Sequence, residues 1–107
     1  MATDPSRTPK VRVELQYFEG CPNWKIADRH LRTLAIELGF VLGHRLVESP
    51  EEAEAAHFLG SPTILVDGRD PFARQDQPVG LSCRVYVTPQ GPAGSPTIDQ
   101  LRRALDA

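Results

Sequence analysis

The 107-residue sequence predicts an α/β fold with a mixed four-stranded sheet and helices on both faces. The chain contains two kinds of segment in succession. In one kind apolar and polar residues alternate, and in the other apolar residues recur every three or four positions. These two patterns are typical of strands and helices, respectively. The resulting order, β-α-β-α-β-β-α, favours a mainly parallel sheet with an antiparallel hairpin at one edge. We expect one domain over residues 11–107, preceded by a disordered tail over residues 1–10.

The first strand and helix enclose the residue most suited to chemistry. Apolar residues alternate through VRVELQYF, and an amphipathic helix follows as far as Gly39, which suits a helix C-cap. Between them Cys21 precedes Pro22, a good first helical residue because its missing N–H group would lack a partner there. We therefore expect Cys21 to be the N-cap. Free N–H groups and the helix dipole would stabilise its thiolate, although a buried structural cysteine is the other interpretation.

The middle of the chain predicts a second strand over residues 41–48 and a short helix after it. Ser49 and Glu52 have the spacing of a capping box around Pro50, and Gly60 would end this helix. Residues 63–66 form an apolar run typical of a buried strand. A turn at residues 67–68 and a long loop over residues 69–79 follow.

The last strand is predicted over LSCRVYV, residues 81–87. We expect Cys83 on its buried apolar face, and Arg84 on the other face. Cys83 would then be a core cysteine, less reactive than Cys21 and too distant to form a disulfide with it. The alternative is that Cys83 pairs with Cys21, either in a disulfide or around a soft metal ion. A Pro/Gly loop over residues 88–95 leads to a final helix, which starts at Ser95 or with Thr97 and Gln100 as a capping box.

Two motifs resemble the thioredoxin superfamily: Cys-Pro-Asn-Trp at residues 21–24, and Gly-Ser-Pro-Thr at residues 60–63. The resemblance extends from Val11 to Leu105 and implies a thioredoxin-like fold, with a cis bond before Pro62 and its loop beside Cys21. Residues 60–72 and 80–86 also resemble small bacterial thioredoxin-like proteins, some of which are described as alkylmercury-lyase-like.

The resemblance implies a substrate-binding surface around the catalytic Cys21. Its residues would be Pro22, Trp24, Ser61, Pro62 and Thr63. Trp24 replaces the second cysteine of glutaredoxin-type members, which argues against ordinary dithiol chemistry; it also suits an aromatic that covers the helix–sheet junction. We therefore expect monothiol exchange at Cys21, as in a thiol–disulfide oxidoreductase, with glutathione, another low-molecular-weight thiol or a partner protein's cysteine. The alternatives are a non-catalytic binding module, and thiol capture of a soft metal such as mercury.

Composition excludes several other classes of function. A net charge of −2 disfavours nucleic acid and anionic membranes as partners, and no apolar run approaches the ~20 residues of a membrane span. The N-terminus lacks the apolar core of a secretory signal, so we expect a cytoplasmic protein. His30, His44 and His57 lack the spacing of metal ligands, and we expect neither a metal site nor a bound cofactor.

Overall fold

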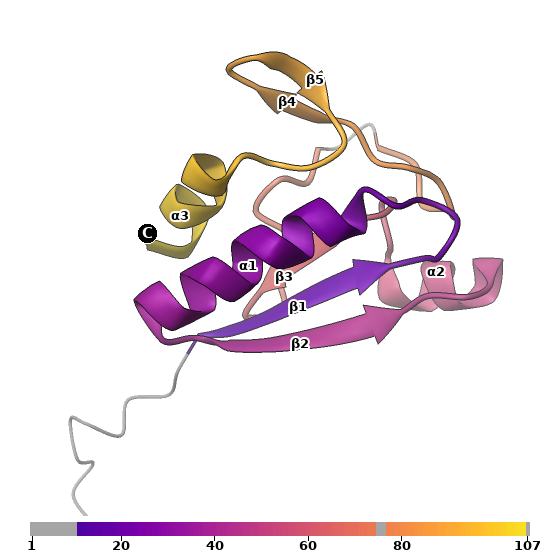
Figure 1. The fold of residues 1–107 in the computed structure, drawn as a ribbon. Coiled ribbons are helices and arrows are strands. Elements are labelled where there is room, and N and C mark those ends of the chain that lie inside the picture. Colours follow the sequence, from indigo (N-terminus) through magenta and orange to yellow (C-terminus); the bar gives the residue numbers. More distant parts are fainter. Residues whose placement is uncertain (1–10, 75–76, 107) are drawn as a thin grey trace, which may run out of the picture.

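The computed structural model describes residues 11–74 and 77–106; the predicted N-terminal tail lies outside them. Strands and helices occur in the order β-α-β-α-β-β-β-α (Figure 1). They are β1 (Arg12–Tyr17), α1 (Trp24–Leu38), β2 (Val41–Leu46), α2 (Pro50–Ala56), β3 (Thr63–Val66), β4 (Tyr86–Thr88), β5 (Gly91–Ala93) and α3 (Ile98–Asp106). The α/β class is confirmed, and β5 was not predicted.

The main sheet is mixed and has the strand order β2-β1-β3. The central strand β1 runs parallel to β2, with Arg12 opposite Val41, and antiparallel to β3, with Val13 opposite Val66. The parallel pair is joined through α1, as expected of a β-α-β unit. In this arrangement the loops that follow β1 and β2 meet at one end of the sheet.

The predicted four-stranded sheet is wrong in the described part of the chain, where the main sheet has three strands. The segment expected as the fourth strand contacts the residues before β3 through an isolated parallel bridge between Cys83 and Ser61, but it does not join the main sheet. Its end forms β4, which pairs with β5 in a separate two-stranded sheet. The Thr88 hydroxyl group donates to the Gly91 carbonyl oxygen at 2.6 Å and accepts from the Gln90 N–H group at 3.2 Å. These bonds stabilise a tight turn that folds the chain back on itself, so a hairpin replaces the predicted loop (Figure 1).

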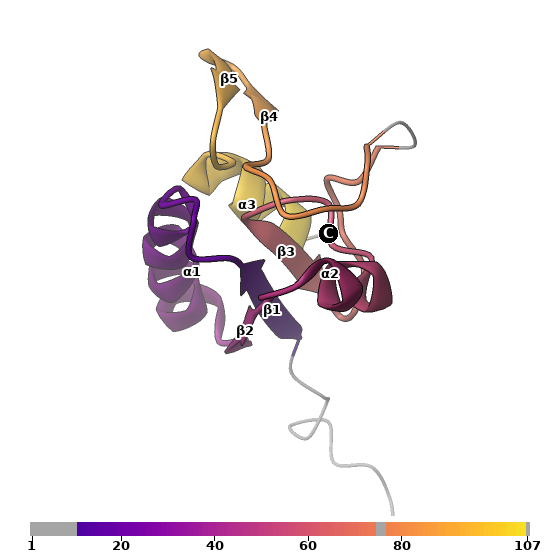
Figure 2. The ribbon, with the colours of Figure 1, turned by 90° about the vertical axis from the view of Figure 1, so that its right-hand side faces the viewer.

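The helices cover the sheet unequally. α1 and α3 pack over one face, and the buried residues there are Val13, Leu15, Ala27, Leu31, Leu34, Phe40, Ile64, Tyr86 and Leu101. α2 lies on the opposite side of β1 from α1 (Figure 2). It belongs to a second, smaller cluster with buried Val47, Ala53 and Phe58, located at the carboxyl ends of β1 and β2. Helices therefore occur on both sides of the sheet, but α2 packs beyond its end.

Three predicted ends of the helices are confirmed, but the predicted end of α2 at Gly60 is wrong, because α2 ends at Ala56 with His57 as its C-cap. Gly39 has a φ of 80° and donates its N–H group to the Ala35 carbonyl oxygen at 2.8 Å, which closes α1. The Ser49 hydroxyl group accepts from the Glu52 N–H group at 3.1 Å and begins α2. Thr97 is the cap of α3 rather than Ser95. Its capping box with Gln100 has two reciprocal bonds, of 2.9 and 3.1 Å.

Candidate redox site

Cys21 and Cys83 form a disulfide, so the expectation that they are too far apart is wrong. Their Cα atoms lie 5.6 Å apart, which is a usual separation for a disulfide. The expectation failed because it placed Cys83 in a fourth strand beside β3. The chain instead passes Cys83 along Ser61, directly beside the loop that carries Cys21. No cysteine in the described residues is free.

The loop between β1 and α1 places Cys21 inside the molecule, with no exposed surface. The predicted N-cap role of Cys21 is wrong, because the cap of α1 is Asn23. The Pro22 carbonyl oxygen accepts from the Lys25 N–H group at 3.1 Å, so a separate turn comes before the helix. Asn23 has a second contact: its side-chain amide donates to the Cys21 Sγ atom at 3.5 Å. Asn23, rather than a position at the helix cap, supplies a hydrogen-bond donor to this sulfur.

Gly94 lies close against the side chain of Asn23. A Cβ atom built on Gly94 would overlap the Asn23 side-chain amide and would lie only 3.0 Å from the Asn23 Cβ atom. The absence of a side chain at Gly94 therefore leaves room for the Asn23 amide in its position beside the sulfur.

Ser61 connects the two cysteine-bearing segments. Its hydroxyl group accepts from the Phe18 N–H group at 3.3 Å, three residues before Cys21. Its N–H group donates to the Ser82 carbonyl oxygen at 2.8 Å, and its carbonyl oxygen accepts from the Arg84 N–H group at 2.9 Å. These last two bonds flank Cys83 on both sides. The Ser61 carbonyl oxygen also lies 3.8 Å from the Cys21 Sγ atom.

The bond between Ser61 and Pro62 is cis, as the thioredoxin resemblance implied. Ser61 and Thr63 are buried, with 0% and 1% of their surfaces exposed. Thr63 donates its hydroxyl group to the Gly60 carbonyl oxygen at 2.7 Å. These contacts are internal to the loop, so the roles of Ser61, Pro62 and Thr63 in substrate binding remain predictions.

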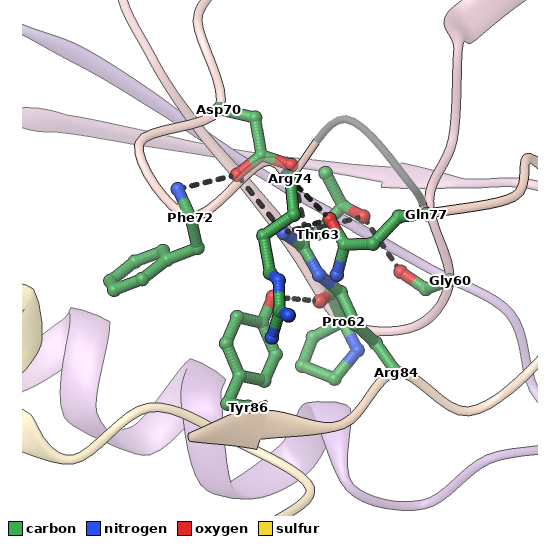
Figure 3. A network of polar contacts seen from close by, with 9 residues as sticks. All are labelled: Gly60, Pro62, Thr63, Asp70, Phe72, Arg74, Gln77, Arg84 and Tyr86. Carbon is green, nitrogen blue, oxygen red and sulfur yellow. Dashed lines mark hydrogen bonds and ion pairs between the residues drawn. The ribbon is translucent and has the colours of Figure 1, made fainter. Parts of the chain in front are cut away.

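Arg84, the neighbour of Cys83, is held by a buried polar network (Figure 3). Its guanidinium group lies 2.7 Å from an Asp70 carboxylate oxygen, and donates at 3.4 Å each to Thr63 and Gln77. Its side chain is 1% exposed, and that of Asp70 11%. A buried arginine is stable only when paired in this way, so the network holds the Cys83 segment in one position.

Tyr86 extends the network towards the proline loop. Its hydroxyl group donates to the Pro62 carbonyl oxygen, and its ring lies 4.7 Å from the Arg84 guanidinium carbon and meets the Phe72 ring edge-on at 5.4 Å. Burial raises the pKa of Tyr86 well above its usual value. The phenol therefore stays a neutral hydrogen-bond donor at physiological pH.

The faces of the segment around Cys83 are reversed from the prediction. Arg84 and Tyr86 are 3% and 4% exposed, whereas Val85 and Val87 are 62% and 67% exposed. Cys83 shares the exposed face. The disulfide therefore joins a buried Cys21 to an exposed Cys83, so the expectation that burial would protect Cys83 is wrong.

Two further residues of the predicted substrate surface differ in exposure. Pro22 is exposed beside the disulfide. The Trp24 ring stacks on Tyr17, with ring centroids 4.3 Å apart, and packs against the main core. Trp24 thus covers the helix–sheet junction, and a role in binding substrate remains a prediction.

Sequence reasoning missed Asn23, Asp70 and Arg84. The available signal was a single charged residue next to the cysteine in an otherwise apolar segment, together with an acidic residue in a long loop. Nothing in the local sequence joins Arg84 to Asp70, because they are fourteen residues apart.

The three histidines lie away from the two cysteines in sequence and each has its own local surroundings. His44 lies 2.6 Å from the Asp28 carboxylate, and His57 caps α2 in the left-handed conformation, with a φ of 52°. Burial and the nearby Arg29 lower the pKa of His30. Within the ranges 11–74 and 77–106, no group of three or more His, Cys, Asp or Glu residues is arranged to hold a metal ion.

A groove lies at the carboxyl ends of β1 and β2, close in sequence to both cysteines. It has a volume of about 250 Å³, and its lining residues are Phe18, Glu19, Gly20, Leu46, Val47, Glu48 and Leu81. Gly20 immediately precedes Cys21, and Leu81 lies two residues before Cys83. In open α/β sheets this end of the strands is the usual place for ligands.

No protein-family model matches the sequence, and no curated protein shows significant sequence similarity to it. The thioredoxin resemblance therefore remains a prediction from the two sequence motifs. None of the helices that the structure describes is long and apolar enough to cross a membrane.

Proposed function

We propose that this chain is a thioredoxin-like protein that exchanges disulfides through Cys21 and Cys83 acting as a pair. The observation that carries the proposal is their disulfide, which joins one buried and one exposed cysteine. Cys83 supplies the second thiol that Trp24 leaves out of the helix-start motif. This replaces the monothiol exchange that the sequence suggested with exchange by two cysteines.

The exposed partner is the point of attack. A thiolate from a partner protein or a small thiol attacks the Cys83 Sγ atom, forms a mixed disulfide there, and releases Cys21 as a thiolate. A second thiolate of the partner then attacks the mixed disulfide and releases Cys83. The partner's two thiols become a disulfide, and two electrons and two protons pass to the protein. The reverse steps reduce a partner's disulfide.

Asn23 supports the release of Cys21. A thiolate leaves faster when its negative charge is stabilised, and the Asn23 amide already donates to this sulfur in the disulfide form. Hydrogen bonds to charged groups are roughly twice as strong as those between neutral groups. The bond therefore strengthens as the sulfur becomes a thiolate, which favours the exchange step.

Two single-cysteine variants test the order of attack. With the neutral disulfide of 2-mercaptoethanol, Cys21→Ser should form a mixed disulfide at Cys83, at least tenfold faster than Cys83→Ser forms one at the buried Cys21. The unmodified reduced protein should return to its internal disulfide. Intact-mass measurement separates these products. Faster reaction of Cys83→Ser would reverse the roles of the two cysteines, and no mixed disulfide in either variant would contradict the exchange function.

A cytoplasmic location is part of the same proposal. Disulfides in the cytosol are mostly transient and catalytic, because thiol pools keep other cysteines reduced. A reversible Cys21–Cys83 pair fits this condition, whereas a permanent disulfide would indicate an oxidising compartment.

A further inference from the structure

The groove at the carboxyl ends of β1 and β2 has an apolar floor. Both cysteine-bearing segments contribute to it, Phe18 from the loop before Cys21 and Leu81 from the segment before Cys83, and Leu46 and Val47 complete it. Its volume of about 250 Å³ is below the range of pockets for drug-sized ligands. The groove therefore suits one apolar side chain that lies next to a cysteine under attack.

The charged lining residues of the groove are both acidic. Glu19 and Glu48 are exposed, and Glu51 and Glu52 begin α2 immediately after Glu48. Neither basic residue close in sequence to the cysteines lines the groove: Arg84 is paired with Asp70 inside the molecule, and the Lys25 ammonium group lies over the Trp24 ring on α1.

We propose that the groove binds a segment of a partner protein in which the reacting cysteine is flanked by an apolar residue and by a lysine or arginine. The apolar residue fills the floor, and the basic residue lies against Glu19 and Glu48. The same carboxylates repel anionic thiols, so glutathione, with its net negative charge, is a poor substrate. This inference rests on the exchange function proposed for Cys21 and Cys83.

Matched peptide disulfides test the charge preference. The probes are acetyl-Lys-Cys-Leu-amide and acetyl-Glu-Cys-Leu-amide, each linked through its cysteine to thionitrobenzoate. Attack by the Cys83 thiolate on the peptide sulfur releases the coloured thionitrobenzoate, and Cys21 then closes the internal disulfide and releases the peptide thiol. The rate with each peptide is divided by its rate with a small neutral thiol, which removes the peptide's intrinsic reactivity.

The expected preference for the lysine peptide is on the order of tenfold at low salt. Coulomb's law in water gives about a twofold change in rate for each carboxylate that lies ~8 Å from the charged side chain of the peptide. Replacing the peptide's lysine by glutamate reverses the sign of this interaction, so the energy difference between the two peptides is twice as large. The preference should fall close to unity in 1 M salt, where screening extends to about 3 Å. Acetyl-Lys-Cys-Ser-amide should react several-fold more slowly than its leucine counterpart, because it leaves the floor empty.

A double variant locates the preference in the groove. Glu19→Gln with Glu48→Gln should remove most of it. Glu37→Gln with Asp99→Asn removes the same number of carboxylates from the α1–α3 surface, at the opposite end of the sheet, and should leave it unchanged (Figure 1). A preference of unity in the unmodified protein, or equal loss in both double variants, contradicts the inference and leaves the exchange function standing. No reaction with any peptide contradicts both.

Discussion

The segments that carry the two cysteines differ in what determines their structure. Cys21 lies between elements that follow one another directly along the chain: the alternating strand β1, the turn at Pro22 and the start of α1. Local sequence therefore determines the path of the chain there. Around Cys83, the same kind of alternation gives two faces, but distant partners decide which face is buried. Asp70, Thr63 and Gln77 accept hydrogen bonds from the two terminal nitrogens of Arg84, which favours its inward orientation.

This difference shows that an alternating strand pattern defines two faces but does not decide which of them is buried. Val85 and Val87 are the more hydrophobic residues, yet they are exposed, and Arg84 and Tyr86 are buried. The arginine and the tyrosine can be buried because their polar atoms have partners, apart from the Arg84 Nε atom, for which none is found in the described part of the chain. Cys83 is exposed as a consequence, and the site therefore depends on contacts that no short window of sequence contains.

Opening the disulfide should have the largest effect, because it removes the covalent link between the two segments. The cysteines are 62 residues apart in the sequence, and closing a loop of that length restricts the unfolded chain. Chain-entropy reasoning gives about 4 kcal/mol of stability for such a loop. Urea unfolding of the oxidised protein and of the protein kept reduced measures this difference. Cys21→Ala with Cys83→Ala should match the reduced protein; a difference below about 1 kcal/mol would show that the link contributes little.

Arg84→Met should have the next largest effect and should act on the Cys83 segment alone. Removing one partner of a buried ion pair leaves an uncompensated charge, here on Asp70, and costs about 3 kcal/mol. Urea unfolding in the oxidised state measures the loss. Arg102→Met breaks the exposed pairs with Glu37 and Asp99 and should leave the unfolding midpoint almost unchanged. Equal effects of the two variants would mean that burial does not distinguish the pairs.

Gly94→Ala should alter the Cys21 side of the site with a smaller effect on stability. The added methyl group displaces the Asn23 amide, so the departing Cys21 thiolate loses its hydrogen-bond donor. A loss near 1.4 kcal/mol corresponds to about tenfold slower opening of the disulfide by dithiothreitol. Gly43→Ala is the matched control, because its added Cβ atom would meet no atom within 4 Å. An unchanged rate for Gly94→Ala would contradict the role given to Asn23.

The smallest effect is expected at Asp28 on α1. Burial acts to raise the pKa of this carboxyl group, but hydrogen bonds from His44 and Arg32 outweigh it and hold the pKa below its ordinary value of 3.8. A lowered pKa in the folded state means that the stabilisation is present above about pH 4 and is lost as the pH falls through the folded-state pKa. Asp28→Asn should therefore flatten the acid side of the stability profile. Identical profiles from urea unfolding between about pH 5 and 2.5 would exclude this contribution.

Local signals predicted several turns and helix ends correctly. Gly39, the Ser49 cap and the turn at Asp67 and Gly68 each depend on backbone conformation within a few residues, and all are confirmed. The helix cap at Cys21 was wrong by two residues, because an extra turn at Pro22 precedes α1. An error of this size is usual for the ends of helices.

The candidate site was predicted only in part. The two motifs correctly placed Ser61 beside Cys21, and the cis bond between Ser61 and Pro62 is confirmed. The disulfide could not be predicted, because the position of Cys83 depends on Ser61, 22 residues earlier, and on the ion pair of Arg84. The β4–β5 hairpin was missed for a related reason, since the bonds of the Thr88 side chain decide between a loop and a turn.

The most direct test of the exchange function is a redox titration of the folded protein. The chain is equilibrated with graded ratios of oxidised and reduced dithiothreitol, quenched in acid and measured by intact mass, with circular dichroism recorded in parallel. We predict a single two-electron transition in which the protein gains two hydrogens and keeps its helical signal, because Ser61 and Arg84 still hold the Cys83 segment. A disulfide that opens only when the protein unfolds would contradict the account and would make the Cys21–Cys83 link a permanent structural one.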